Sequence, residues 1–204
     1  MSATPSCLDS PSVLDALRTR TGHLHTRLEK RMPFFSSRLD LLLYQRLVRA
    51  YYGFYAPLEA ALASSGWVPA GLDLAERRKL PTLLRDLQAL GDDAQVCAQL
   101  PLCQCLPVVD SQAACLGVLY VLEGATLGGQ VLRREMHARL GLDEHNGAAF
   151  LDVYGRDTGR HWKAFLSLLA VQPPDPAFQR AAALAAESTF SCFEQWLEQR
   201  EVLS

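Results

Sequence analysis

Two histidines, His23 and His25, lie in a segment whose leucines repeat every three or four residues, as in an amphipathic helix. With Leu17 as the origin, a rotation of about 100° per residue places His25 about 80° from the leucine stripe and His23 about 240° round. His25 therefore flanks the face predicted to be buried, whereas His23 points to solvent. Imidazole is a common metal ligand, so this position makes His25 the candidate ligand.

Two charged residues near His25 fit the same chemistry. Glu29 follows it by one helical turn, and a histidine that binds a metal typically donates its other ring N–H to such a carboxylate. Arg18 precedes His25 by seven residues, about 10 Å along the axis on nearly the same face, where it can meet an anionic group of the same ligand. A lone histidine is more often a satisfied core or surface residue, and we retain that interpretation for His23.

Three glycines, Gly124, Gly128 and Gly129, lie in an apolar stretch that we expect to form one long helix over residues 113–140. Each glycine in a helix interior costs about 1 kcal/mol relative to alanine, so a helix carries them where something approaches its backbone or where it bends. Together with Gly117, the first two share one face. This bare face fits either close packing against another helix or a flat ligand, and the stretch alone does not choose between them.

Helical periodicity elsewhere, with no sustained alternation of the strand kind, predicts an all-α protein. A single helical domain is expected over 10–204 after a flexible tail over 1–9, with Ser10 as the N-cap of the first helix and a proline after it. Pro81 should break a helix or start a new one. The expected helices span 10–31, 37–65, 72–90, 94–100, 113–140, 148–171 and 177–201, the sixth being interrupted around 154–159.

The 204 residues carry a net charge of −2, with 49% hydrophobic and 21% charged residues. This composition is ordinary for a globular protein and gives no electrostatic argument for binding nucleic acid or an anionic membrane. No apolar run reaches membrane-spanning length without charge or glycine, and residues 1–11 lack the pattern of a secretory signal, so a cytoplasmic protein is expected. The six cysteines are scattered, and the one close pair, Cys103 and Cys105, has no further metal ligands nearby, so thiols are expected.

Three segments together resemble the heme oxygenases, in particular their bacterial branch. The first-helix motif Arg18-x-x-Thr21-x-x-x-His25-Thr26-x-x-Glu29 resembles the proximal motif of that family, and Leu119–Gln130 (LYVLEGATLGGQ) looks like its distal helix. Phe150–Gly155 (FLDVYG), with Trp162 and Phe165, is similar to its C-terminal region. The resemblance spans residues 13–196, and residues 60–110 match only in helical character.

This resemblance implies an all-α, single-domain fold in which heme is sandwiched between a proximal and a distal helix. His25 would be the proximal ligand of the heme iron, and Glu29 would orient its ring. Gly124 and Gly128 would be the catalytic distal glycines, whose backbone presses on the heme. Other expected pocket residues are Arg18 and Tyr120 at the propionates, with Thr21, Gly129, Ala125, Trp162 and Phe165; Arg133, Arg156 and Arg160 are further propionate candidates.

The resemblance also implies an activity. Heme b would be both cofactor and substrate, and O2 with electrons from an external ferredoxin or reductase would open the ring to biliverdin, carbon monoxide and ferrous iron. The stretch Glu123-Gly124-Ala125 looks more like the phytochrome-associated members, so a bacteriophytochrome is an expected acceptor of biliverdin, with iron acquisition as the other purpose. Which meso carbon is attacked is not decided by the sequence.

One position departs from the family pattern. Many heme oxygenases have an aspartate directly after the first distal glycine, where it orders water that delivers a proton, and this chain has Ala125. The departure leaves open a heme carrier or sensor on the same fold. A thiaminase-like enzyme is a third hypothesis, for which Cys115 would have to be the nucleophile although no base is evident beside it.

Overall fold

The computed structural model describes residues 12–204, and this part of the chain is helical throughout, without a strand. The predicted tail over 1–9 and the predicted cap Ser10 lie outside the described residues. The α-helices are α1 (Val13–Arg31), α2 (Leu41–Ser64), α3 (Leu80–Ala89), α4 (Ala94–Ala98), α5 (Gln112–Gly124), α6 (Gly129–Leu140), α7 (Thr158–Ala170) and α8 (Pro176–Gln199). Five short 3₁₀ turns are η1 (Pro33–Phe35), η2 (Ala75–Arg77), η3 (Ala125–Gly128), η4 (Phe150–Asp152) and η5 (Gly155–Asp157).

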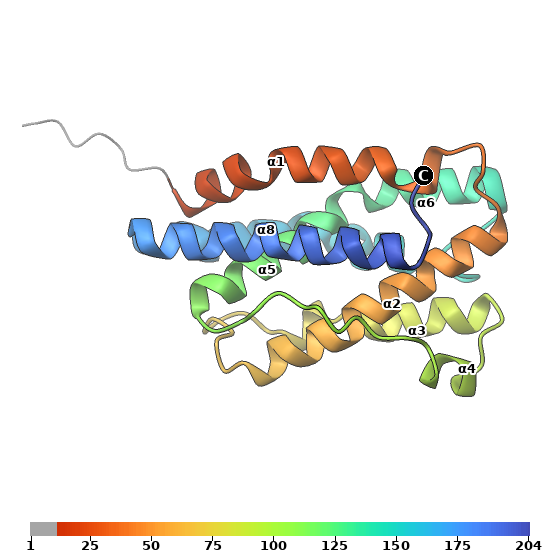
Figure 1. Cartoon of the computed structure of the whole chain (residues 1–204), viewed down its shortest axis with the longest axis horizontal. Coiled ribbons are helices and arrows are strands. Elements are labelled where there is room, and N and C mark those ends of the chain that lie inside the picture. Colours follow the sequence, from red (N-terminus) through yellow and green to blue (C-terminus); the bar gives the residue numbers. More distant parts are fainter. Residues whose placement is uncertain (1–11) are drawn as a thin grey trace, which may run out of the picture.

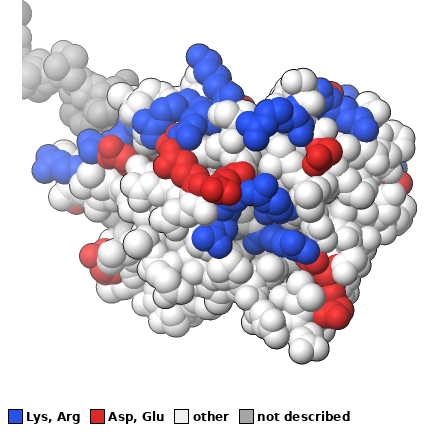
Figure 2. Space-filling model, turned by 45° about the vertical axis from the view of Figure 1, so that its right-hand side comes forward, with Lys and Arg blue, Asp and Glu red and all other residues white. Residues whose placement is uncertain are grey.

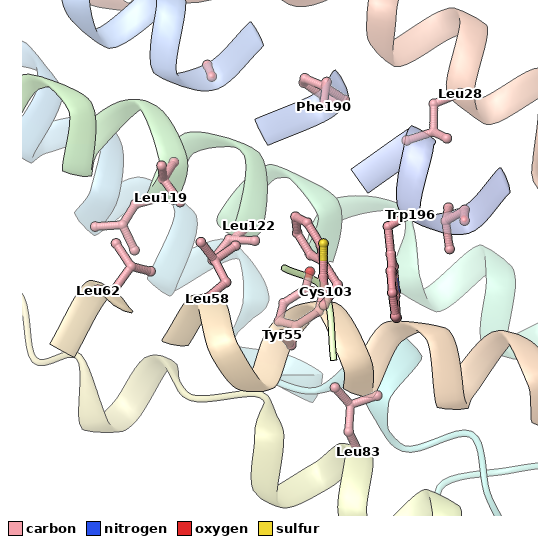
Figure 3. Close-up of a cluster of buried hydrophobic side chains, with 14 of the residues drawn as sticks. Leu28, Tyr55, Leu58, Leu62, Leu83, Cys103, Leu119, Leu122, Phe190 and Trp196 are labelled. Carbon is pink, nitrogen blue, oxygen red and sulfur yellow. The ribbon is translucent and has the colours of Figure 1, made fainter. Parts of the chain in front are cut away.

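The long helix α8 holds the fold together. It packs along α5 and along α1, and it also touches α2, so the N-terminal helix and the glycine-containing helix lie against the same element (Figure 1). Leu119 and Leu122 of α5 face Leu58 and Leu62 of α2 in the core (Figure 3). The apolar stripes of these helices thus bury one another, which is the main stabilising term in an all-helical domain.

Helix α1 begins two residues later than the sequence predicts. Ser12, not Ser10, is the N-cap, because its hydroxyl accepts from the Asp15 N–H while the Asp15 carboxylate accepts from the Ser12 N–H. This reciprocal pair is a capping box, which satisfies two otherwise orphaned backbone donors. The helix ends at Arg31, just before Pro33, as predicted.

The predicted long helix over 113–140 is wrong as a single element. It is divided into α5 and α6 by the 3₁₀ turn η3, which begins directly after Gly124. The Thr126 hydroxyl donates to the Glu123 carbonyl at 2.7 Å, and such back-bonding from a side chain bends helices. Gly141 has φ +70 and caps α6 in the left-handed conformation.

The apolar stretch Gln112–Leu140 is long and apolar enough to cross a membrane by length and composition alone. Its most apolar window is 56% buried inside the protein, and α5 packs closely on α8. The stretch therefore has the pattern of a core helix.

Smaller differences concern helix ends and facing. The second helix begins at Leu41, not 37, because the Asp40 carboxylate caps it by accepting from Leu43 N–H. Pro81 starts α3, as predicted, since its missing N–H is not needed in the first turn. Leu184 of α8 is 45% exposed, so it lies outside the buried face of that helix. On the face shown in Figure 2, Lys and Arg side chains lie along the upper part and over the centre, with Asp and Glu among them.

Candidate functional site

The glycines of α5, η3 and α6 fall into two groups by what surrounds them. A Cβ added at Gly117 would fall on the carbonyl oxygen of Ala182 in α8, and one at Gly129 would fall on the carbonyl oxygen of Leu151 in η4. A Cβ added at Gly124 or Gly128 would meet nothing within 4 Å. Close packing therefore explains Gly117 and Gly129, whereas Gly124 and Gly128 present bare backbone to open space.

Two apolar side chains accompany the open glycines. Leu127 and Val131 are 49% and 58% exposed, and they lie three and seven residues after Gly124, on the same side of a helix. Sequence analysis did not single them out. Their spacing in the sequence was the available signal. Apolar residues at these spacings extend the bare face into a wider apolar surface, which a flat apolar ligand would cover.

The imidazole of His25 is accessible on α1, with 56% of the side chain exposed. Its Nδ1 lies 3.3 Å from the Glu29 carboxylate one turn later, and its ring meets the Phe190 ring edge-on at 6.2 Å. A carboxylate at Nδ1 stabilises the proton there and leaves the Nε2 lone pair for a metal. No hydrogen bond of Nε2 is found within residues 12–204, so this nitrogen is available as a ligand.

His23 has different surroundings. It lines an open groove of about 670 Å³ between α1 and α8, together with Arg20, which pairs with Glu187 across the groove. The groove contains none of the predicted site residues and has no glycine in its walls. Its volume alone therefore gives no reason to prefer it, because the exposed imidazole with a carboxylate partner and the open glycines lie elsewhere.

The aromatic residues predicted for the pocket form one chain of contacts. Tyr120 of α5 lies against Trp162 of α7, with ring centroids 6.1 Å apart, and Trp162 lies 5.8 Å from Phe165. Phe165 is fully buried. Thr21 is also buried, and its hydroxyl donates to Leu17 O at 2.8 Å. Thr21 and Phe165 thus belong to the core under the site, whereas Tyr120 and Trp162 are partly accessible.

The candidate cations differ in what they already bind. Arg133 pairs with Glu144 at 2.5 Å and lies 3.5 Å from Asp152, and Arg160 pairs with Asp157 at 3.0 Å. Arg18 is exposed on α1, and it has no ion pair within 4 Å in the described part of the chain. An anionic group would not have to displace a carboxylate from Arg18, which favours it over Arg133 and Arg160 as a partner.

A cluster of buried charges that the sequence patterns did not reveal lies next to the glycine turn. Glu123, 1% exposed, accepts hydrogen bonds from Arg77, from Lys79 Nζ at 2.7 Å and from the Tyr154 hydroxyl at 2.9 Å. The available signal was a single acidic residue inside the apolar run Cys115–Gly124, since a buried carboxylate requires cationic partners. Its partners come from distant segments and could not be named from the sequence.

These features fit heme. The open backbone at Gly124 and Gly128 is a cradle that a side chain would fill, and the accessible Nε2 of His25 suits an iron. Helix α7 touches both α1 and η3, so it joins the two elements that carry these groups.

Comparison with known proteins agrees with the all-helical fold. The family model described as heme oxygenase matches residues 12–199. A heme oxygenase of Xanthomonas campestris pv. campestris (strain 8004) is 28% identical over 159 residues, which cover 78% of this chain and 91% of that protein. The chain belongs to the heme oxygenase family, whose members are heme-degrading enzymes.

Solved structures show the same fold at low identity. Heme oxygenase from Leptospira interrogans has a TM-score of 0.75 at 20% identity, covering 93% of this chain and 100% of that one. The NO- and CO-bound heme oxygenase from Neisseria meningitidis has a TM-score of 0.72 at 20% identity, with 95% and 94% covered. Heme oxygenase-1 from Synechocystis sp. PCC6803, in complex with heme, has a TM-score of 0.71 at 16% identity, with 94% and 93% covered.

Proposed function

We propose that heme lies between α1 and the α5–η3–α6 segment, with His25 Nε2 as the axial ligand of its iron. The observation that carries this proposal is the contrast among the glycines: Gly117 and Gly129 are needed for packing, whereas Gly124 and Gly128 leave a side-chain-free surface that the fold itself does not use. A flat macrocycle can approach such a surface to van der Waals contact. Leu127 and Val131 then cover its apolar area.

Bound heme supplies the redox chemistry that activates O2 and is itself the molecule that is degraded to biliverdin, carbon monoxide and ferrous iron. The chain supplies binding and orientation. Glu29 holds the His25 ring through Nδ1, and Arg18 and Tyr120 meet the propionates at the edge. The bare backbone at Gly124 and Gly128 would lie against one face of the bound macrocycle and would limit the space left on that side.

Replacing His25 tests the assignment, and His23 is a matched control two residues away on the same helix. In His25→Ala the spectrum of the ferric heme complex should lose its histidine-ligated form, with heme degradation lost, and added imidazole should restore the spectrum. His23→Ala should bind and degrade heme as the wild type does, because His23 faces the α1–α8 groove. Equal spectra for wild type and His25→Ala would contradict the proposal.

An assay of the wild-type heme complex distinguishes an enzyme from a carrier or sensor. Loss of the Soret band of the wild-type complex under reductant and oxygen, with formation of biliverdin, is expected from the enzyme, whereas a carrier would bind heme and stop there. The thiaminase-like hypothesis is wrong, since the chain belongs to the heme oxygenase family. Cys115 is also fully buried, and burial raises the pKa of its thiol to about 11, so it is no nucleophile at neutral pH.

The partners follow from this chemistry as further proposals. Electrons come from an external ferredoxin or reductase, and a bacteriophytochrome in the same cytoplasm is the proposed acceptor of biliverdin. Chromatographic separation of the biliverdin isomers identifies the meso carbon attacked, and assembly of a photoactive phytochrome from the product tests the acceptor. A product that no phytochrome takes up would favour iron acquisition.

A further inference from the structure

Two side chains contact the His25 ring, and they differ in how firmly they can hold it. Glu29 lies 3.3 Å from Nδ1, but its side chain is 66% exposed and belongs to the same helix. Phe190 of α8 meets the ring at a centroid distance of 6.2 Å, with an angle of 89° between the two planes. Phe190 is 8% exposed, so the core sets its position.

The pair with Glu29 is a weak restraint by itself. Exposed pairs one helical turn apart contribute little, because solvent screens them and the side chains lose rotamer freedom. The torsion between the Cβ atom of a histidine and its ring is also broad, and an exposed carboxylate can follow the ring as it turns. One hydrogen bond at Nδ1 therefore directs a proton but does not fix the plane of the imidazole.

The contact with Phe190 restrains that plane. Two aromatic rings favour an edge-to-face arrangement, because the positive edge of one ring meets the negative face of the other, and the observed angle is almost perpendicular. Rotation of the imidazole about its Cβ–Cγ bond would lose this arrangement. Phe190 does not follow such a rotation, because it is packed in the same buried core as Leu28 of α1 (Figure 3).

The register of α1 on α8 keeps Phe190 beside His25. Three of the ion pairs between the helices have the same separation of 167 residues: Arg20–Glu187, Arg27–Glu194 and Arg31–Glu198. The constant separation shows that the helices run parallel in one register, as their ribbons do in Figure 1. His25 and Phe190 lie between the first and the second of these pairs, so the contact is set by the packing of whole helices.

We propose that Phe190 is a positioning residue that fixes the plane of the proximal imidazole, while Glu29 fixes the proton at Nδ1. The two residues thus restrain different properties of one ligand. This inference rests on the proposed heme site, in which His25 binds the iron. A ring held in this way loses less freedom when it binds the metal, which favours binding.

The test uses the ferric heme complex with cyanide bound, because its low-spin EPR signal depends on the orientation of the axial imidazole. The wild type should give one narrow signal. Phe190→Leu removes the aromatic ring, so we expect the signal to broaden or split as the imidazole takes several orientations. Heme affinity should fall by about 2- to 10-fold, since an edge-to-face pair makes a modest contribution.

Phe193→Leu is the matched control. Phe193 lies one turn further along α8, with its ring 5.4 Å from that of Tyr51 and 4.8 Å from that of Phe54, and within residues 12–204 it has no ring contact with His25. This substitution also removes one phenylalanine ring from α8. A general loosening of the helix would therefore affect both variants, whereas only Phe190→Leu should change the EPR signal.

Glu29→Gln separates the two restraints. It should shift the iron–histidine stretching band in the resonance Raman spectrum of the ferrous complex, because a carboxylate no longer attracts the Nδ1 proton. The width of the EPR signal should stay as in the wild type, because the contact between His25 and Phe190 is intact.

A narrow wild-type signal in Phe190→Leu, or equal broadening in Phe193→Leu, overturns the inference while the heme site stands. Nuclear Overhauser contacts between the rings of His25 and Phe190 in the heme-free wild type test it without any substitution, and their absence overturns it as well. A wild-type heme complex without a histidine-ligated spectrum overturns the heme site itself and this inference with it.

Discussion

Neither the backbone conformation nor the packing of the protein requires glycine at Gly124 or at Gly128. The backbone at both positions has negative φ and lies in the right-handed region, so neither residue is needed for its conformation. A side chain there would also meet no protein atom. In the heme-free protein the two glycines are therefore a cost without a structural return, as the proposed heme contact would explain.

Replacing Gly124 with alanine should therefore have opposite effects on the stability of the protein and on its affinity for heme. We expect Gly124→Ala to raise the free energy of unfolding of the heme-free protein by about 0.5–1 kcal/mol, the usual gain for replacing a helical glycine, and to weaken heme binding. Gly159→Ala is the control, because Gly159 in α7 is equally open; it should gain stability with heme affinity unchanged. Thermal unfolding and a spectrophotometric heme titration measure the two quantities. Equal heme affinity in Gly124→Ala would place the heme elsewhere.

A larger residue on the same face should stop the chemistry. Gly128→Leu is expected to keep the fold, since the space outside Gly128 is open, but to fill the distal side of the heme and abolish turnover. Circular dichroism checks the fold, and biliverdin formation checks the activity. Turnover at the wild-type rate would show that Gly128 does not face the heme.

At the scale of elements, the contact between α5 and α8 depends on Gly117. Its missing side chain lets α5 approach the backbone of α8 at Ala182. We expect Gly117→Ala to destabilise the protein by about 1–3 kcal/mol, because a methyl group there forces the helices apart. Gly22→Ala on α1, where a methyl group meets nothing, should be neutral or stabilising. Chemical denaturation of both variants gives the comparison, and a neutral Gly117→Ala would contradict the packing described here.

Some elements could be predicted from the sequence and others could not. The end of α1, the approximate extent of α8, the start of α3 next to Pro81 and the cap at Gly141 follow from local patterns of apolar residues, proline and glycine. The η3 break did not follow from such patterns, because the bond of the Thr126 hydroxyl to the Glu123 carbonyl at this point is not specified by residue type alone. His25 could be identified from its phase and Glu29, whereas the partners of Glu123 come from segments 44 or more residues before it and 31 after it.

At the scale of the whole molecule, α1 is held to α8 by an ionic contact. Glu194, 6% exposed, accepts hydrogen bonds from Arg27 and from Arg31. Burial alone would raise the pKa of the Glu194 carboxyl, but the two arginines outweigh burial and the pKa lies below its ordinary value. This carboxylate therefore contributes stability at every pH above its unfolded value of about 4.3, and the contribution is lost as the pH falls through the folded value.

Glu194→Gln should show this contribution directly. At pH 7 we expect a loss of about 1.5–3 kcal/mol, the range for hydrogen bonds to charged groups, and the difference from wild type should shrink below pH 4. Glu198→Gln is the control, because Glu198 is half exposed and pairs with Arg31 alone. Unfolding by denaturant at several pH values measures both. A pH-independent difference for Glu194→Gln would contradict the assigned pKa direction.

The position of α8 between α1 and α5 has a consequence for evolution. In the proposed heme site, α1 and α5 both pack on α8, so the width of the gap between them depends on both of these helix contacts. Substitutions along α8 are therefore expected to change the affinity for heme without altering any residue that contacts it.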